Sequence, residues 1–264
     1  MATDASAEGP VKTTMDGSVA ILTMQAAPYN LLDRVMNQAL IAGLHWAREQ
    51  AARAVVLQSS LRHFSAGANL DQMIIDADAN DGVLDWKLLE ILAEFDSFPA
   101  PIVASVHGTC VGGGFELVLA SDISIVAASA KLGSVEATVG LHPLMGGIQR
   151  LVQRAGLARG KEMAMLGRRY DPATLERWGV INMVVDEEHL RSATMTIAQE
   201  LAHGPTVCHA QTKKLAAIAI NEGVHAADLA MPSIQQEVFR SKDFHTGVKS
   251  YQEKGIGMAR FEGR

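Results

Sequence analysis

The sequence has few cysteines, no long apolar run and no N-terminal targeting pattern. Cys110 and Cys208, far apart and in small-residue or apolar surroundings, are the 2 cysteines among 264 residues, which favours free thiols in a reducing compartment over a disulfide. No apolar run approaches the roughly 18 residues that a membrane-spanning helix needs. Residues 1–17 lack the apolar core of a signal peptide and the Arg-rich pattern of a transit peptide. These absences predict a cytoplasmic protein without a membrane segment.

The charge balance argues against nucleic acid as a partner. The chain carries 23 Lys and Arg against 29 Asp and Glu, a formal net charge of −6, and no run of one sign is long enough to form an arm or tail. Nucleic-acid binding depends on cations that neutralise phosphates. The nine histidines show no metal-ligand spacing such as H-E-x-x-H, so no metal site is expected.

Short apolar, β-branched runs alternate with helical patterns over the first part of the chain. Runs of this kind are typical of strands covered on both faces, and they lie at 19–24, 54–60, 101–106 and 123–128. Helical patterns at 31–50 and roughly 84–97 precede the second and third of these runs, which indicates an α/β fold. After about residue 187 the strand signal disappears, and four helices are expected near 188–203, 205–221, 223–239 and 241–253. The sequence therefore predicts an α/β core followed by an all-helical region.

Three consecutive glycines, residues 112–114, and the carboxylate of Glu116 stand out within a small and apolar stretch. They follow an expected strand, and the apolar spacing after them places a helix start near Gly113. The free N–H groups of a helix N-terminus bind anions, and glycine lets a ligand approach that backbone closely. The stretch lacks the Lys-Ser/Thr of a P-loop, and Leu117 stands where a dinucleotide fingerprint needs glycine. An oxyanion that develops during a reaction fits instead. Tight strand-helix packing, with Glu116 in the first helical turn, explains the stretch equally well.

Two further stretches supply what an oxyanion site would need. Residues 62–73, RHFSAGANLDQM, follow another expected strand and again combine small residues with a helix start. Two strand-loop-helix turns could then each donate one N–H to the same oxygen. Residues 131–151 carry a second carboxylate, Glu136, between small residues. Two glutamates beside an oxyanion site would form a proton-transfer pair next to a carbonyl.

Together these stretches resemble the crotonase superfamily, the enoyl-CoA hydratase/isomerase proteins. The similarity runs from APYNLLD at 27–33, which resembles a Pro-x-Asn-x-Leu segment of that family, to the closing segment 241–264, which resembles its helical tail. The resemblance implies a crotonase (ClpP-like) spiral of β-β-α units, with an acyl-CoA-binding core domain at 1–195 and a C-terminal helical oligomerisation region at 196–264. It also implies a homotrimer or a dimer of trimers.

The resemblance assigns roles to single residues. Ala68 in FSAGANL and Gly113 in VGGGFE would donate the two N–H groups of an oxyanion hole, and Glu116 and Glu136 would be the catalytic pair. It implies hydration of trans-2-enoyl-CoA, with Glu116 mainly handling the water and Glu136 protonating C2. Coenzyme A would be part of the substrate, so no separate cofactor is expected. Substrate contacts are expected from Ala66, Ala68, Asn69, Leu70, Asp71 and Gly113, and walls of the acyl pocket from Met73, Ile74, Ile75, Leu84 and Trp86.

Alternatives remain open at this stage. Within the family, a Δ3-Δ2-enoyl-CoA isomerase needs only one carboxylate, and a protein that binds acyl-CoA without turnover is a third possibility. Asn69 stands where the family commonly has aspartate, and no arginine precedes the Pro-x-Asn segment. The groups that face the CoA phosphates are therefore not assigned. His142 is either a third acid-base group or a structural polar residue. The basic residues between 150 and 169 form either a solvated helix face or a contact to CoA phosphates or a neighbouring subunit.

Overall fold

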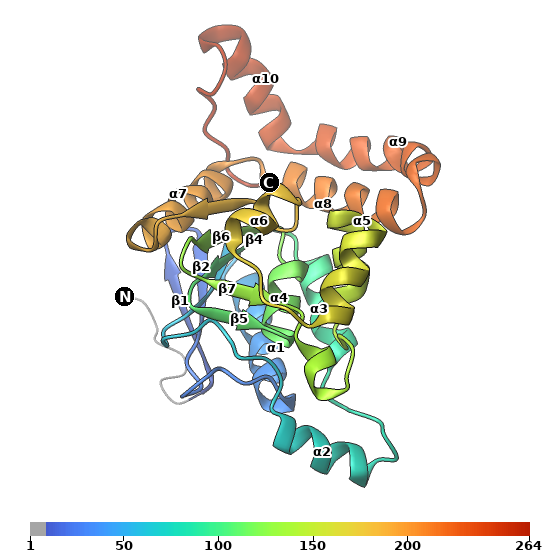
Figure 1. Cartoon of the computed structure of the whole chain (residues 1–264). Helices are drawn as coiled ribbons and strands as arrows, with labels where there is room; N and C mark the ends of the chain where they lie inside the picture. The colour runs from blue at the N-terminus through green and yellow to red at the C-terminus, as the bar shows by residue number, and fades with distance from the viewer. Residues whose placement is uncertain (1–8) are drawn as a thin grey trace.

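A six-stranded sheet in the order β1-β2-β3-β4-β6-β8 lies at the centre of the computed structural model, which describes residues 9–264 (Figure 1). Residues 1–8, part of the segment for which no targeting signal is predicted, lie outside the described residues. Only β1 and β2 pair antiparallel; every later neighbour in this sheet pairs in parallel. The strands span Val11–Asp16, Val19–Met24, Ala54–Ser59, Ile102–Val106, Ile123–Ala127 and Met183–Val185.

Two β-β-α units build the part of the fold that carries the candidate site. β5 (Thr109–Val111) and β7 (Lys131–Gly133) pair in parallel as a second, two-stranded sheet. β5 connects β4 to α4 (Gly113–Ala120), and β7 connects β6 to the short helix η1 (Glu136–Val139) and then to α5 (Gly147–Leu166). This repeat agrees with the expected spiral of β-β-α units.

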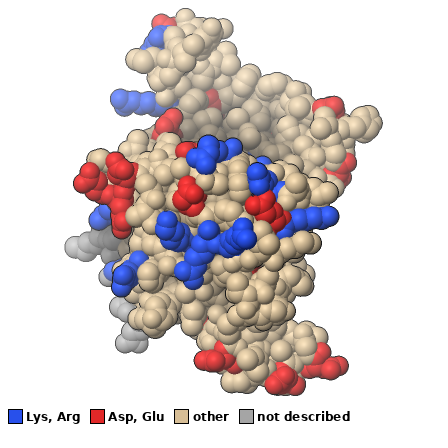
Figure 2. All heavy atoms as spheres, viewed as in Figure 1, with Lys and Arg blue, Asp and Glu red and all other residues tan. Residues whose placement is uncertain are grey.

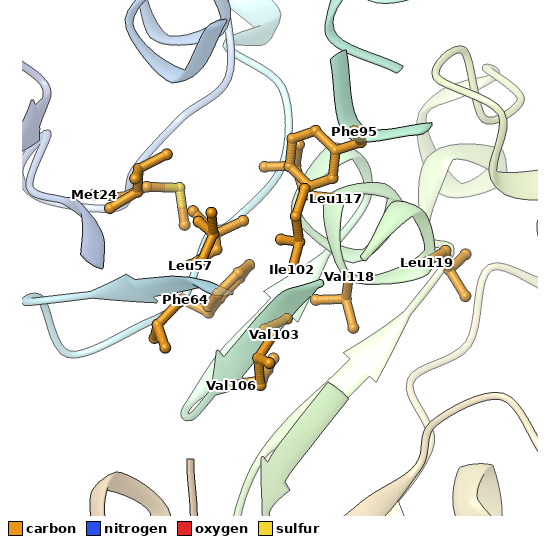
Figure 3. Packing of buried hydrophobic residues seen from close by; sticks show 14 of the residues in the cluster. Met24, Leu57, Phe64, Phe95, Ile102, Val103, Val106, Leu117, Val118 and Leu119 are labelled. Atoms are coloured by element: carbon orange, nitrogen blue, oxygen red, sulfur yellow. The ribbon is translucent and has the colours of Figure 1, made fainter. Parts of the chain in front are cut away.

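Helices cover both faces of the large sheet and begin where the sequence provides caps. The Asp33 side chain accepts a hydrogen bond from the Met36 backbone N–H and so caps α1 (Arg34–Glu49). Asn69 caps α2 in the same way. Figure 3 shows the core between sheet and helices, where Leu57, Phe64 and Ile102 are fully buried. The remaining helices before the C-terminal region are α2 (Leu70–Ala79), α3 (Leu88–Ser97), α6 (Pro172–Arg177), η2 (Glu187–His189) and α7 (Leu190–His203).

The four apolar runs and the helical patterns are confirmed, whereas β1, β5, β7 and β8 are additional strands. β5, β7 and β8 are each three residues long, too short to show a periodic pattern. The first residues of β1 alternate between buried and half-buried, but four of its six residues are polar and it pairs at an edge of the sheet. Cys110 is buried and Cys208 is half-buried, and both are free thiols as expected.

Three C-terminal helices extend away from the sheet at the top of Figure 1: α8 (Thr206–Asn221), α9 (Val224–Arg240) and α10 (Lys242–Lys254). The boundary expected at 195/196 falls inside α7, whose Thr194 and Ala198 are buried against the sheet, so the extended helical region begins with α8. No residue of α8 is buried. None of the helices in the described part of the chain has the length and apolar character needed to cross a bilayer.

Candidate active site

Two loops run side by side in the same direction and bring Ala68 next to Gly113. Ser65 pairs in parallel with Cys110: the Ser65 N–H donates to Thr109 O at 3.2 Å, and the Val111 N–H donates to Ser65 O at 3.1 Å. Continuing this register by three residues places Ala68 beside Gly113. A Cβ added to Gly67 would lie 3.6 Å from the Cα of Gly112, which confirms that the loops stay in contact.

The N–H groups of Ala68 and Gly113 are free. The Leu32 N–H donates to Gly67 O at 2.8 Å, and the Asn69 N–H donates to Leu32 O at 2.8 Å. Ala68 lies between these two residues, and its own N–H therefore points away from Leu32. Gly113 is the first residue of α4 and has no acceptor within the helix. Neither N–H donates a hydrogen bond within residues 9–264, and both residues line one cavity. The structure thus places both predicted oxyanion donors at the same site.

Close packing of the two loops accounts for the glycines. Gly112 has φ 55° and ψ −133°, which favours glycine. A Cβ on Gly114 would lie 2.5 Å from the Ser65 Cβ, a contact that a larger residue cannot make. Glycine at these two positions therefore lets α4 begin directly against the neighbouring loop.

Glu116 lies on the first turn of α4 and is 4% exposed. Its Oε1 accepts hydrogen bonds from the backbone N–H groups of Met145 and Gly147, each at 2.8 Å. Burial is the main cause that raises the pKa of Glu116, the hydrogen bonds from Gly147 and Met145 lower it, and the nearby charge of Glu136 raises it; together these effects raise the pKa to about 7. A carboxyl group with this pKa exchanges a proton readily near neutral pH.

Glu136 begins η1 and lines the cavity. Its Oε2 accepts a hydrogen bond from the Ser134 hydroxyl at 2.8 Å. Its Oε1 is buried and has no hydrogen-bond partner in the described structure, and a Cβ on Gly112 would lie 3.8 Å from it. A buried acceptor without a partner is costly, and here its residue lines the same cavity as Ala68 and Gly113. This oxygen is placed to exchange a proton with a molecule in the cavity.

The cavity offers about 120 Å³ to water-sized molecules and has mostly apolar walls. Of the expected substrate contacts, Ala66, Ala68, Leu70 and Gly113 line it, together with two of the expected wall residues, Met73 and Trp86. The other expected residues lie elsewhere: Asn69 caps α2, Asp71 is exposed on its first turn, Leu84 is half-buried, and Ile74 and Ile75 are 62% and 60% exposed.

His142 lines the cavity, whereas the basic residues Arg150 and Arg154 of α5 do not. His142 is exposed at its wall, and its Nδ1 is 2.8 Å from Pro143 O. Arg150 pairs with Asp96, and Arg154 donates to three backbone carbonyls, so both have structural partners. Figure 2 shows Lys and Arg side chains gathered over the middle of the viewed face and acidic side chains over α2.

Three features of the site escape sequence reasoning. Ser134 lies two residues before Glu136, where nothing in the pattern distinguishes it from other small residues. The backbone donors of Met145 and Gly147 carry no side-chain signal, because their N–H groups are directed by the turn between η1 and α5.

Within residues 9–264, no three His, Cys, Asp or Glu side chains gather as metal ligands would.

Residues 14–263 match the enoyl-CoA hydratase/isomerase family. The chain belongs to this family. A relative in Bos taurus, mitochondrial enoyl-CoA hydratase domain-containing protein 2, is 31% identical over 246 residues, which cover 91% of this chain and 83% of that protein. A probable enoyl-CoA hydratase of Rhodobacter capsulatus is 30% identical over 245 residues, covering 92% and 95%. A carnitinyl-CoA dehydratase of Salmonella enteritidis is 28% identical over 247 residues, covering 91% and 94%.

Solved structures of enoyl-CoA hydratase/isomerase relatives share the fold. An enoyl-CoA hydratase subunit I from Geobacillus kaustophilus superposes with a TM-score of 0.88 at 27% identity, covering 98% of this chain and 100% of that chain. The enoyl-CoA hydratase of Bacillus anthracis gives a TM-score of 0.82 at 25% identity, covering 97% and 100%. These likenesses confirm the crotonase fold expected for this chain.

Proposed function

We propose that the protein is an enoyl-CoA hydratase, which adds water to a trans-2-enoyl-CoA to give a 3-hydroxyacyl-CoA. The observation that carries this proposal is the juxtaposition of two free backbone N–H groups, on Ala68 and Gly113, with two glutamates that influence each other electrostatically. Hydration needs an oxyanion site for the thioester oxygen and groups that manage a proton at C2 and a water at C3.

In this mechanism the thioester oxygen accepts hydrogen bonds from the Ala68 and Gly113 N–H groups. Water oxygen bonds to C3 while its proton passes to Glu116, and the C2–C3 π electrons move toward the thioester oxygen as an enolate. Glu136, which enters the cycle protonated, then donates its proton to C2 and the thioester carbonyl re-forms. The proton that Glu116 took from water passes to Glu136 and restores the starting state. One donor of an oxyanion hole contributes about 2.7–4 kcal/mol to the stability of such a transition state.

The role of Glu116 is consistent with its environment. Since its pKa is raised to about 7, the side chain is available both as a base and as an acid near neutral pH. Both of its hydrogen bonds from Met145 and Gly147 go to Oε1, so Oε2 is the oxygen left to exchange a proton with water.

A second candidate, Δ3-Δ2-enoyl-CoA isomerase, is favoured by one observation. Glu136 lines the cavity, whereas Glu116 is 4% exposed and is not among the residues that line it. A single carboxylate that removes a proton from C2 and returns it to C4 is sufficient to move a double bond. The two reactions share the oxyanion hole and differ in their need for Glu116.

The first test is to supply the purified protein with crotonyl-CoA and, separately, with a 3-enoyl-CoA. Loss of the conjugated enoyl-thioester absorbance from crotonyl-CoA is the expected result, and its abolition in Glu136→Gln would tie the activity to this site. Rapid gain of that absorbance from the 3-enoyl-CoA, with no hydration of crotonyl-CoA, would replace the hydratase proposal with the isomerase one. Inactivity toward both substrates, with intact binding of butanoyl-CoA, would indicate a binder without turnover.

A further inference from the structure

Leu144 separates the active-site cavity from a second hollow in the same molecule. Its side chain is half-buried and lines the cavity that contains Ala68 and Gly113. It also lines a larger and more open groove of about 660 Å³, to which Leu92 of α3 and Ala217 of α8 contribute. Leu144 is the residue that the two hollows share.

The groove has a wall suited to an apolar chain and offers little to an anion. The cations along it, Lys213, Arg150 and Arg154, already bind carboxylates or backbone carbonyls. Apolar side chains supply much of the remaining wall: Leu89, Leu92, Leu119, Ala216, Ala217 and Ile220.

The reaction geometry directs the acyl chain toward Leu144. With the thioester oxygen between Ala68 and Gly113, C3 must lie beside the glutamates for water to add there. The Leu144 backbone lies close enough to interact with the Glu116 carboxyl group. An acyl chain bound in this way has C4 and later carbons near Leu144, which is part of the wall of the cavity of about 120 Å³.

We propose that Leu144 limits the substrate to short acyl chains and that the groove beyond it is a latent site for longer ones. This proposal rests on the proposed function, because that function places the acyl chain. In the parent protein, carbons beyond the cavity meet the Leu144 side chain. In Leu144→Ala they can continue into the groove and bury apolar surface against α3 and α8.

Three variants test whether the Leu144 side chain acts as a partition between the cavity and the groove. Leu144→Ala removes this partition. Leu141→Ala is the matched control, since Leu141 lines the cavity but not the groove and the same atoms are removed. Leu144→Ala combined with Ala217→Phe opens the partition but fills the groove, because Ala217 is exposed on its wall. Circular dichroism and thermal unfolding establish that each variant is folded.

The measurement is the affinity for saturated butanoyl-CoA and octanoyl-CoA by titration calorimetry, which needs no turnover. Each methylene that becomes fully buried raises affinity up to about fourfold, so four methylenes set a ceiling of about 200-fold. We expect Leu144→Ala to raise the preference for octanoyl-CoA over butanoyl-CoA at least about tenfold. Leu141→Ala should leave that preference unchanged, and Ala217→Phe should remove the gain.

The outcomes separate this proposal from the proposed function. A parent protein that already prefers octanoyl-CoA strongly, an unchanged preference in Leu144→Ala, an equal gain in Leu141→Ala, or a gain that survives Ala217→Phe would each overturn the role of Leu144. A protein that shows the expected preferences but does not hydrate crotonyl-CoA would overturn the hydratase proposal and leave the partition standing. Absence of binding to either thioester would overturn both.

Discussion

Replacing Glu116 with glutamine should stabilise the fold at neutral and alkaline pH while it removes activity. The pKa of Glu116 is raised from 4.5 to about 7, mainly by burial. Between these two values the folded state holds a proton that the unfolded state releases, so stability falls as pH rises through this window. The folded state keeps this stability in full below pH 4.5 and has lost it above pH 7. A difference of about 2.5 pKa units corresponds to about 3 kcal/mol as an upper bound.

Glutamine carries no titrating proton, and its carbonyl oxygen can still accept from the Met145 and Gly147 N–H groups. As the pH rises from 4.5 to 8, the free energy of unfolding of Glu116→Gln should therefore increase relative to that of the parent by up to about 3 kcal/mol. This difference corresponds to about 6–10 °C in Tm. Urea unfolding at the two pH values measures the difference. Glu237→Gln, at an exposed position on α9, is the control and should show no such gain. An equal effect of Glu116→Gln at both pH values would refute the raised pKa.

Three further predictions follow from the free N–H groups, the C-terminal helices and the cysteines. Gly113→Pro should lower turnover about 10²–10³-fold by removing an oxyanion donor. Gly113→Ala adds a Cβ 2.8 Å from the flexible end of Leu32 but keeps the N–H, so it should lose much less; equal losses would refute donation by Gly113. Light scattering should show a homotrimer or a dimer of trimers, as the family resemblance implies, because the C-terminal helices α9 and α10 expose Leu229, Phe239 and Tyr251 in the single chain; a stable, active monomer would contradict this. A thiol reagent should modify Cys208 before Cys110 in the native protein, because burial raises the pKa of the Cys110 thiol; the reverse order would be contrary evidence.

Much of the fold can be predicted from the pattern of apolar residues along the chain. The runs 19–24, 54–60, 101–106 and 123–128 form parallel neighbours β2, β3, β4 and β6, because strands covered on both faces read as continuous apolar stretches. β8 could not be predicted in this way, since it is three residues long and pairs with β6 at the sheet edge. Its place depends on tertiary pairing rather than on local pattern.

Only part of the candidate site could be predicted from the sequence. The glycines and small residues around Ala68 and Gly113 indicate that two backbone segments approach closely, because few other residues fit there. The helix beyond Asn69 turned outward instead, so Ile74 and Ile75 are exposed rather than part of the pocket wall. Their spacing on α2 cannot distinguish a cavity wall from a surface that faces solvent in the single chain.

The most direct test of two-glutamate hydration compares Glu116→Ala with Glu136→Ala on two substrates. We predict that Glu116→Ala abolishes hydration of crotonyl-CoA but retains some conversion of a 3-enoyl-CoA to a 2-enoyl-CoA, since that shuttle needs only the carboxylate that lines the cavity. Glu136→Ala should abolish both reactions, while butanoyl-CoA binding persists in each folded variant because backbone groups hold the thioester. Hydration of crotonyl-CoA by Glu116→Ala at the parent rate would contradict the account.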